Sequence, residues 1–158
     1  MQQQARALYN STHPKRLHFL IKFREGDVLV MLLGEIIAGL PWGLLLVTDE
    51  GSDDEIPDLS SEDELVTASA TALVVRTMHA AEGSTSVRVW RGEEIAVGQP
   101  VYSGMIEVPT GILRVGDATG DQSRKFNISP GRYVIEVVLD PPREATQVNI
   151  VINPAPGS

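Results

Sequence analysis

The stretch from Phe126 to Leu139 limits the folds open to this chain more than any other part of the sequence. Ser129-Pro130-Gly131 has the composition of a turn, because proline presets one backbone angle and glycine accepts angles that other residues avoid. The residues that follow alternate between two faces of an extended segment, with Tyr133, Ile135, Val137 and Leu139 on one face and Val134, Glu136 and Val138 on the other. This pattern predicts a strand whose first set of side chains faces the core.

Turn residues and short apolar runs recur at close intervals from residue 66 to residue 152. No segment in this range has the helical pattern of roughly 10 to 15 residues that alternates with strands in parallel sheets. Aromatic residues make up only 5% of the chain, whereas valine, isoleucine and leucine are plentiful, so we expect an aliphatic and largely β-branched core. These features predict an all-β fold, a single antiparallel β-sandwich with an acidic loop and at most short helices.

At 158 residues the chain is expected to form one domain. We predict a flexible N-terminal arm over residues 1–16, the β-sandwich over residues 17–152 and a flexible tail over residues 153–158. The N-terminus lacks the apolar core of a secretory signal, so a cytoplasmic location is expected. Cysteine is absent, which excludes disulfides and thiolate metal sites.

The apolar stretch over residues 28–47 is open to three interpretations. A membrane span is disfavoured because Glu35 lies near its middle, where an acidic side chain costs about 2.5 kcal/mol or more on insertion. A buried helix over residues 28–40 remains an alternative to strands, since periodicity does not separate the two in a continuous apolar run.

Glycines within this stretch, together with Pro41-Trp42-Gly43, favour the third interpretation, which is a pair of short buried strands. We predict these strands from Val28 to Leu33 and from Leu44 to Thr48. The first is the expected hairpin partner of an alternating segment from Leu17 to Phe23, because turn residues separate the two.

The formal net charge of −8 is concentrated in one short loop. Nine of the 21 acidic residues lie within residues 49–64, which contain no lysine or arginine: Asp49, Glu50, Asp53, Asp54, Glu55, Asp58, Glu62, Asp63 and Glu64. The rest of the chain, which holds all 13 basic residues, is close to neutral. Such a loop attracts a basic surface and repels phosphate. We therefore expect these nine residues to bind a basic protein partner, a toxin or nuclease, and we expect no direct contact with nucleic acid.

Other interpretations of this region stay open. Its charges repel one another, so it also suits a solvated, mobile linker without a partner. Leu44 to Val47, followed by acidic residues up to position 55, resembles a SUMO-interacting motif, in which an apolar strand pairs with the edge of a partner's sheet, but the apolar residues suit a core strand better. Ser61-Glu62-Asp63-Glu64 fits a capping box and predicts one helical turn.

No constellation of residues indicates an enzyme. His13, His18 and His79 share no metal-ligand spacing, and neither a nucleophile elbow nor a phosphate-binding glycine motif is present. The stretch from Asp117 to Asp121 offers oxygens to calcium, but aspartate and glycine at such spacing are typical of a hairpin turn, which we favour. We expect no cofactor and no metal, and the alternative is a small hydrolase whose site is built from loops and one histidine.

The segment from Val108 to Leu139 resembles a pattern in small bacterial β-sandwich proteins. Its V-P-T-G-I-L-R-V and I-S-P-G-R-Y-V-I-E-V runs are similar to two late strands of the competence J group, inhibitors of the DNA-entry nuclease, and of comparable immunity proteins of toxin systems. The resemblance covers residues 67–152, and its motifs are structural rather than catalytic. It implies a β-sandwich and a non-enzymatic inhibitor or immunity role, and it transfers no functional residue.

Overall fold

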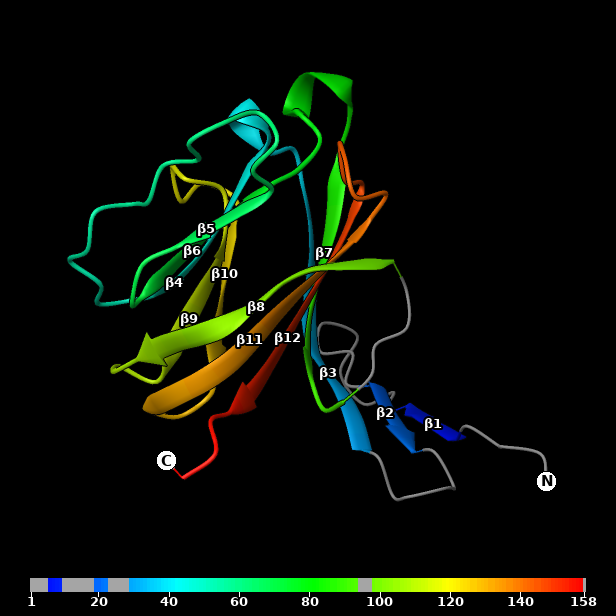
Figure 1. Ribbon diagram of the computed structural model, residues 1–158. Helices are drawn as coiled ribbons and strands as arrows, with labels where there is room; N and C mark the ends of the chain where they lie inside the picture. Colours follow the sequence, from blue (N-terminus) through cyan, green and yellow to red (C-terminus); the bar gives the residue numbers. More distant parts are fainter. Residues whose placement is uncertain (1–5, 10–18, 23–28, 94–97, 158) are drawn as a thin grey trace.

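Two β-sheets pack face to face in this protein (Figure 1). The computed structural model describes residues 6–9, 19–22, 29–93 and 98–157. The seven strands of the larger sheet are, in order across it, β1 (Arg6–Tyr9), β2 (Phe19–Lys22), β3 (Leu29–Ala38), β7 (Thr85–Arg91), β12 (Gln147–Pro154), β11 (Gly131–Asp140) and β8 (Gln99–Val108). The five strands of the smaller sheet are β10 (Ser123–Asn127), β9 (Ile112–Gly116), β4 (Leu44–Asp49), β6 (Ala72–Arg76) and β5 (Val66–Ala68).

The all-β sandwich predicted from the sequence is confirmed. Among the described residues, the helical segments are two short 3₁₀ turns, η1 (Pro41–Gly43) and η2 (Ala80–Glu82). One pairing departs from the antiparallel expectation, because β7 and β12 run parallel, with Val87 opposite Val148 and Val89 opposite Ile150. All four of these side chains are buried, so the parallel pair lies over the centre of the core.

Strand β11 lies between β8 and β12 and supplies much of the core. Tyr133, Ile135, Val137 and Leu139 are all buried, as the alternation predicted. The hydroxyl of Tyr133 lies 2.5 Å from the carbonyl oxygen of Ile128 and 2.6 Å from that of Ser129. This side chain therefore holds the turn that precedes its own strand. Val138, on the opposite face, is also buried, so the alternation does not separate the two faces completely.

Within the stretch over residues 28–40, Leu29 to Ala38 form strand β3, and the helix alternative is wrong. β3 continues five residues beyond the predicted end at Leu33 and pairs antiparallel with β2 in the predicted hairpin. Gly34 lies within the strand and does not end it. Its missing side chain leaves room for residues of the other sheet to come close. A Cβ at Gly34 would lie 2.7 Å from the guanidinium of Arg124, which donates a hydrogen bond to the carbonyl of Glu35 at 3.1 Å.

The region over residues 66–152, where the sequence predicts closely spaced strands and turns, contains β5 and β6 as two separate short strands and the longer strands that follow them. Residues 94–97 of this region lie outside the described residues. At the ends of the chain, β1 falls within the predicted N-terminal arm, and β12 extends two residues past position 152. No helix in the described ranges is long and apolar enough to cross a membrane.

Candidate functional site

Residues 50–65, here called the acidic segment, connect β4 to β5 without a strand or helix of their own. Figure 1 shows the segment looping along the outer side of the smaller sheet, from the end of β4 back to the region of η1. Leu59 packs there against a small cluster of buried residues, Leu46, Ala72 and Val74. An apolar residue within the acidic sequence therefore attaches the segment to the sheet.

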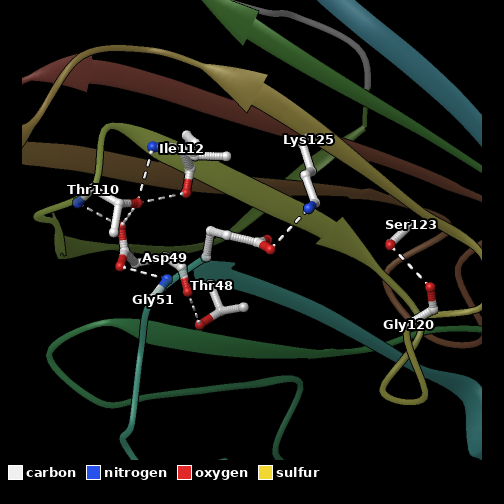
Figure 2. A network of polar contacts seen from close by, with 9 residues as sticks. Thr48, Asp49, Gly51, Thr110, Ile112, Gly120, Ser123 and Lys125 are labelled. Carbon is white, nitrogen blue, oxygen red and sulfur yellow. Dashed lines mark hydrogen bonds and ion pairs between the residues drawn. The ribbon is translucent and has the colours of Figure 1, made fainter.

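Asp49, the first of the nine predicted partner-binding acids, is the last residue of β4 and is only 3% exposed. Its Oδ1 accepts hydrogen bonds from the backbone N–H of Thr110 at 3.1 Å and from the Thr110 hydroxyl at 2.6 Å (Figure 2). Its Oδ2 accepts the backbone N–H of Gly51 at 3.0 Å. A buried carboxylate requires such donors, because an unpaired buried charge is costly. Asp49 thus joins β4 to the turn between β8 and β9.

Two further acids are held by neighbouring strands and turns. Glu50 forms an ion pair with Lys125 on β10 at 2.8 Å. Asp54 accepts a hydrogen bond from the Thr71 hydroxyl at 2.5 Å. Thr71 has one hydroxyl proton, so the Ser52 hydroxyl, also 2.5 Å away, donates to Thr71. These contacts attach the start of the acidic segment to β10 and to the turn between β5 and β6.

Two arginines hold the far end of the acidic segment. Arg76 donates through Nε to the carbonyl of Glu64 at 3.2 Å and through Nη2 to the carbonyl of Ser61 at 3.0 Å. Arg143, in the loop between β11 and β12, forms an ion pair with Asp63 at 2.7 Å. The segment is therefore anchored at both ends by side chains of the sandwich.

Glu64 turns back onto the segment itself. Its carboxylate accepts the hydroxyl of Ser60 at 2.6 Å and the backbone N–H of Ser60 at 2.5 Å, and these hydrogen bonds lower the pKa of Glu64. The helical turn predicted over residues 61–64 is wrong. Glu64 binds Ser60, which is one residue before the serine of the predicted capping box. The Ser61 carbonyl accepts hydrogen bonds from both Arg76 and the N–H of Glu64. The turn that results is not continued as a helix.

The remaining four predicted acids are exposed to solvent: Asp53, Glu55, Asp58 and Glu62. None of them forms an ion pair or hydrogen bond with the part of the chain that the structure describes. Nine acids that are equivalent in the sequence are thus divided between intramolecular contacts and free carboxylates.

A pocket of about 240 Å³ opens between the acidic segment and the outer face of the smaller sheet. Its apolar lining includes Trp42, Leu44, Leu46, Ile56, Leu59 and Val74, and its charged lining residues are Asp58 and Arg76. Trp42 is 65% exposed and Ile56 is 50% exposed, so two large apolar side chains stand open to solvent beside free carboxylates. Neither residue was predicted from the sequence to belong to a site. The only signal there is that Ile56 is an apolar residue inside the acidic run and Trp42 is one that precedes it.

The SUMO-type interpretation of residues 44–55 is wrong. Leu44 to Val47 form most of β4, which pairs with β9 on one side and with β6 on the other. A strand bonded along both edges has no free backbone groups for the sheet edge of a partner. The core-strand interpretation of these residues is confirmed.

His79, one of three histidines considered for catalysis, has a structural contact. Its Nδ1 accepts the backbone N–H of Ala81 at 2.9 Å and so caps η2. His13 and His18 lie outside the described residues.

Asp117, considered for calcium binding, is buried and belongs to a turn, as favoured from the sequence. Its carboxylate accepts the hydroxyl of Thr119 at 2.9 Å and the N–H of Gln122 at 3.2 Å. Within the described ranges, no group of three or more histidine, aspartate or glutamate side chains is placed to hold a metal ion.

The fold is similar to those of two proteins of known structure. ComJ from Bacillus subtilis, an inhibitor of the DNA-degrading activity of NucA, aligns with a TM-score of 0.62 and 10% identity over 80% of this chain and 98% of its own. The product of crocagin biosynthetic gene J aligns with a TM-score of 0.53 and 15% identity over 79% of this chain and 97% of its own. No protein-family model and no curated protein sequence matches the chain. The predicted resemblance to competence J-like proteins is confirmed at the level of the fold.

Proposed function

We propose that this chain is a non-enzymatic inhibitor or immunity protein that binds a basic toxin or nuclease through its acidic segment. The observation that carries the proposal is the set of four exposed carboxylates that have no partner among the described residues, Asp53, Glu55, Asp58 and Glu62, on a segment anchored at both ends. The fold that the chain shares with ComJ supports a nuclease as the partner.

Anchoring matters to this proposal because a fixed array of charge loses less conformational entropy on binding than a mobile one. The carboxylates then present a negative field to an approaching basic surface and speed its encounter. Salt screens such a field over about 8 to 10 Å near physiological ionic strength, so association should slow as salt is added. The same field disfavours direct binding of nucleic acid, and the proposed site of action is the cytoplasm.

The first experiment captures the partner from the native host with the tagged full-length protein and identifies it by mass spectrometry. The association rate is then measured for the wild type and for a variant with Asp53→Asn, Glu55→Gln, Asp58→Asn and Glu62→Gln. We expect the variant to associate roughly tenfold more slowly at low salt and about equally at high salt.

A matched control removes the same number of charges elsewhere, through Glu93→Gln, Asp121→Asn, Glu136→Gln and Asp140→Asn, all of which are exposed. This control should associate at nearly the wild-type rate. Equal slowing in both variants would mean that net charge, not the acidic segment, drives association. An association rate independent of salt and of both sets of substitutions would reject the proposal.

The competing function is a small hydrolase that uses a histidine. Replacing His13, His18 and His79 by alanine separates the two functions, since partner binding should survive these changes. Loss of a measured hydrolytic activity in that variant would overturn the non-enzymatic proposal.

A further inference from the structure

We infer that the pocket beside Trp42 receives one arginine side chain from a basic segment of the protein partner. This inference deepens the proposed function, on which the choice of a protein partner rests. It assigns the anchor of the interface to Trp42, Ile56 and Asp58, whereas the proposed function concerns the free carboxylates as a charged surface.

The size of the pocket favours a single side chain. Its volume of about 240 Å³ lies below the range of roughly 300 to 1,000 Å³ that is usual for small-molecule and cofactor sites. Apart from Arg76, the lining from β4 and β6 is aliphatic and includes Leu44, Leu46 and Val74. An inserted side chain must therefore have an apolar stem.

Trp42 is held in a conformation that favours exposure of its ring. Its φ of 58° lies in the left-handed region, which bulky residues rarely adopt. The surrounding backbone supports this geometry, because the N–H of Gly43 donates to Leu40 at 3.0 Å and the N–H of Thr77 donates to Gly43 at 2.7 Å. Strained residues of this kind persist where the surroundings determine them, and they cluster at binding sites.

The charges that line the pocket favour a cation. Asp58 has no partner among the described residues, whereas Arg76, the other charged lining residue, already donates hydrogen bonds to the carbonyls of Ser61 and Glu64. Carbonyl groups do not neutralise the charge of Arg76, but that charge acts electrostatically on the Glu64 carboxylate. Arg76 is thus balanced by Glu64, and Asp58 leaves a negative charge at the pocket. Glu55, next to Ile56 in the sequence, adds to it.

Arginine fits both features better than other side chains do. Its aliphatic stem packs on apolar surface while its charged head stays near solvent. Its planar guanidinium stacks on an indole ring and pairs with a carboxylate, which a lysine ammonium does less well. Leucine would fill the apolar part of the pocket but would desolvate Asp58 without pairing it.

The test uses the full-length, ¹⁵N-labelled protein and acetyl-Lys-Gly-X-Gly-Lys-amide peptides in which X is arginine, lysine or leucine. The two lysines keep the general attraction constant, so differences between peptides report the pocket. The chain has two tryptophans, and their indole N–H signals separate the sites. Trp90, whose Nε1 donates to Asn149 in the larger sheet, is the internal control.

We expect the arginine peptide to shift the Trp42 indole signal saturably while the Trp90 signal stays in place. The lysine and leucine peptides should bind about fivefold or more weakly. Asp58→Asn and Ile56→Ala should each weaken binding of the arginine peptide several-fold, whereas Glu136→Gln and Ile37→Ala, at exposed positions on the larger sheet, should not. Trp42→Phe identifies the Trp42 signal by its disappearance.

Equal binding of the arginine and lysine peptides would reduce the effect to charge and overturn the inference. Equal or tighter binding of the leucine peptide, or no saturable shift of Trp42 with any peptide, would overturn it as well. The indole signals test only this inference. The proposed function is tested separately, by the association rate of the native partner, so the two can fail independently.

Discussion

Asp49 and Asp58 are nine positions apart in one acidic run, yet the fold gives them opposite surroundings. Asp49 is buried and accepts three hydrogen bonds from Thr110 and Gly51. Asp58 is exposed and has no partner among the described residues. The charge of a segment therefore does not reveal which of its carboxylates are available to a partner. Asp49, at the end of a strand, meets N–H and hydroxyl donors, whereas Asp58, in the middle of the connection, faces solvent.

The largest effect on stability is expected for Asp49→Ala. It removes a buried carboxylate and leaves the partly buried N–H groups of Thr110 and Gly51 without their acceptor, which should lower the free energy of unfolding by about 3 kcal/mol. Urea denaturation measures the change. Asp58→Ala is the matched control and should alter the free energy by less than about 0.5 kcal/mol. Similar losses in the two variants would show that the contrast between these acids is not energetic.

A smaller effect is expected for Arg76→Ala, which removes the hydrogen bonds to the carbonyls of Ser61 and Glu64. We expect a loss of about 1 to 2 kcal/mol, because the freed carbonyls can be hydrated in part. The acidic segment should also become more sensitive to a glutamate-specific protease. Arg88→Ala, which removes an exposed ion pair with Glu35 on the larger sheet, should leave the cleavage rate unchanged. Equal cleavage of wild type and Arg76→Ala would argue against anchoring by this arginine.

The smallest effect concerns pH and Glu64. Hydrogen bonds from the hydroxyl and backbone N–H of Ser60 lower its pKa in the folded protein below the ordinary value of 4.5. Its contribution to stability is therefore complete above about pH 4.5 and is lost as pH falls through the lower, folded-state pKa. A carboxyl NMR titration should show this lowered pKa in the wild type and a value closer to 4.5 in Ser60→Ala. If the pKa of Glu64 were the same in Ser60→Ala as in the wild type, the Ser60 hydroxyl would not be the cause of the lowered pKa.

The alternating pattern of β11 and the turn before it were predictable because both are local. A strand places every second side chain on the same face. The four apolar residues that alternate in β11 therefore all face the core: Tyr133, Ile135, Val137 and Leu139. The composition of the 129–131 turn likewise acts on the backbone within a few residues. The sequence by itself therefore determined the all-β class, most strand positions and the concentration of charge in one connection.

Only the tertiary structure decided which acids are free, because the donors that occupy Asp49, Asp54 and Asp63 come from distant parts of the chain. Thr110 lies 61 residues from Asp49, and Arg143 lies 80 residues from Asp63. The strand that was predicted to end before Gly34 continues through it, and Arg124 of the other sheet packs against this glycine. The parallel pairing of β7 with β12 and the exposed ring of Trp42 depend in the same way on contacts between separate segments. Local periodicity carries no information about such partners, since they are brought together by packing of the two sheets.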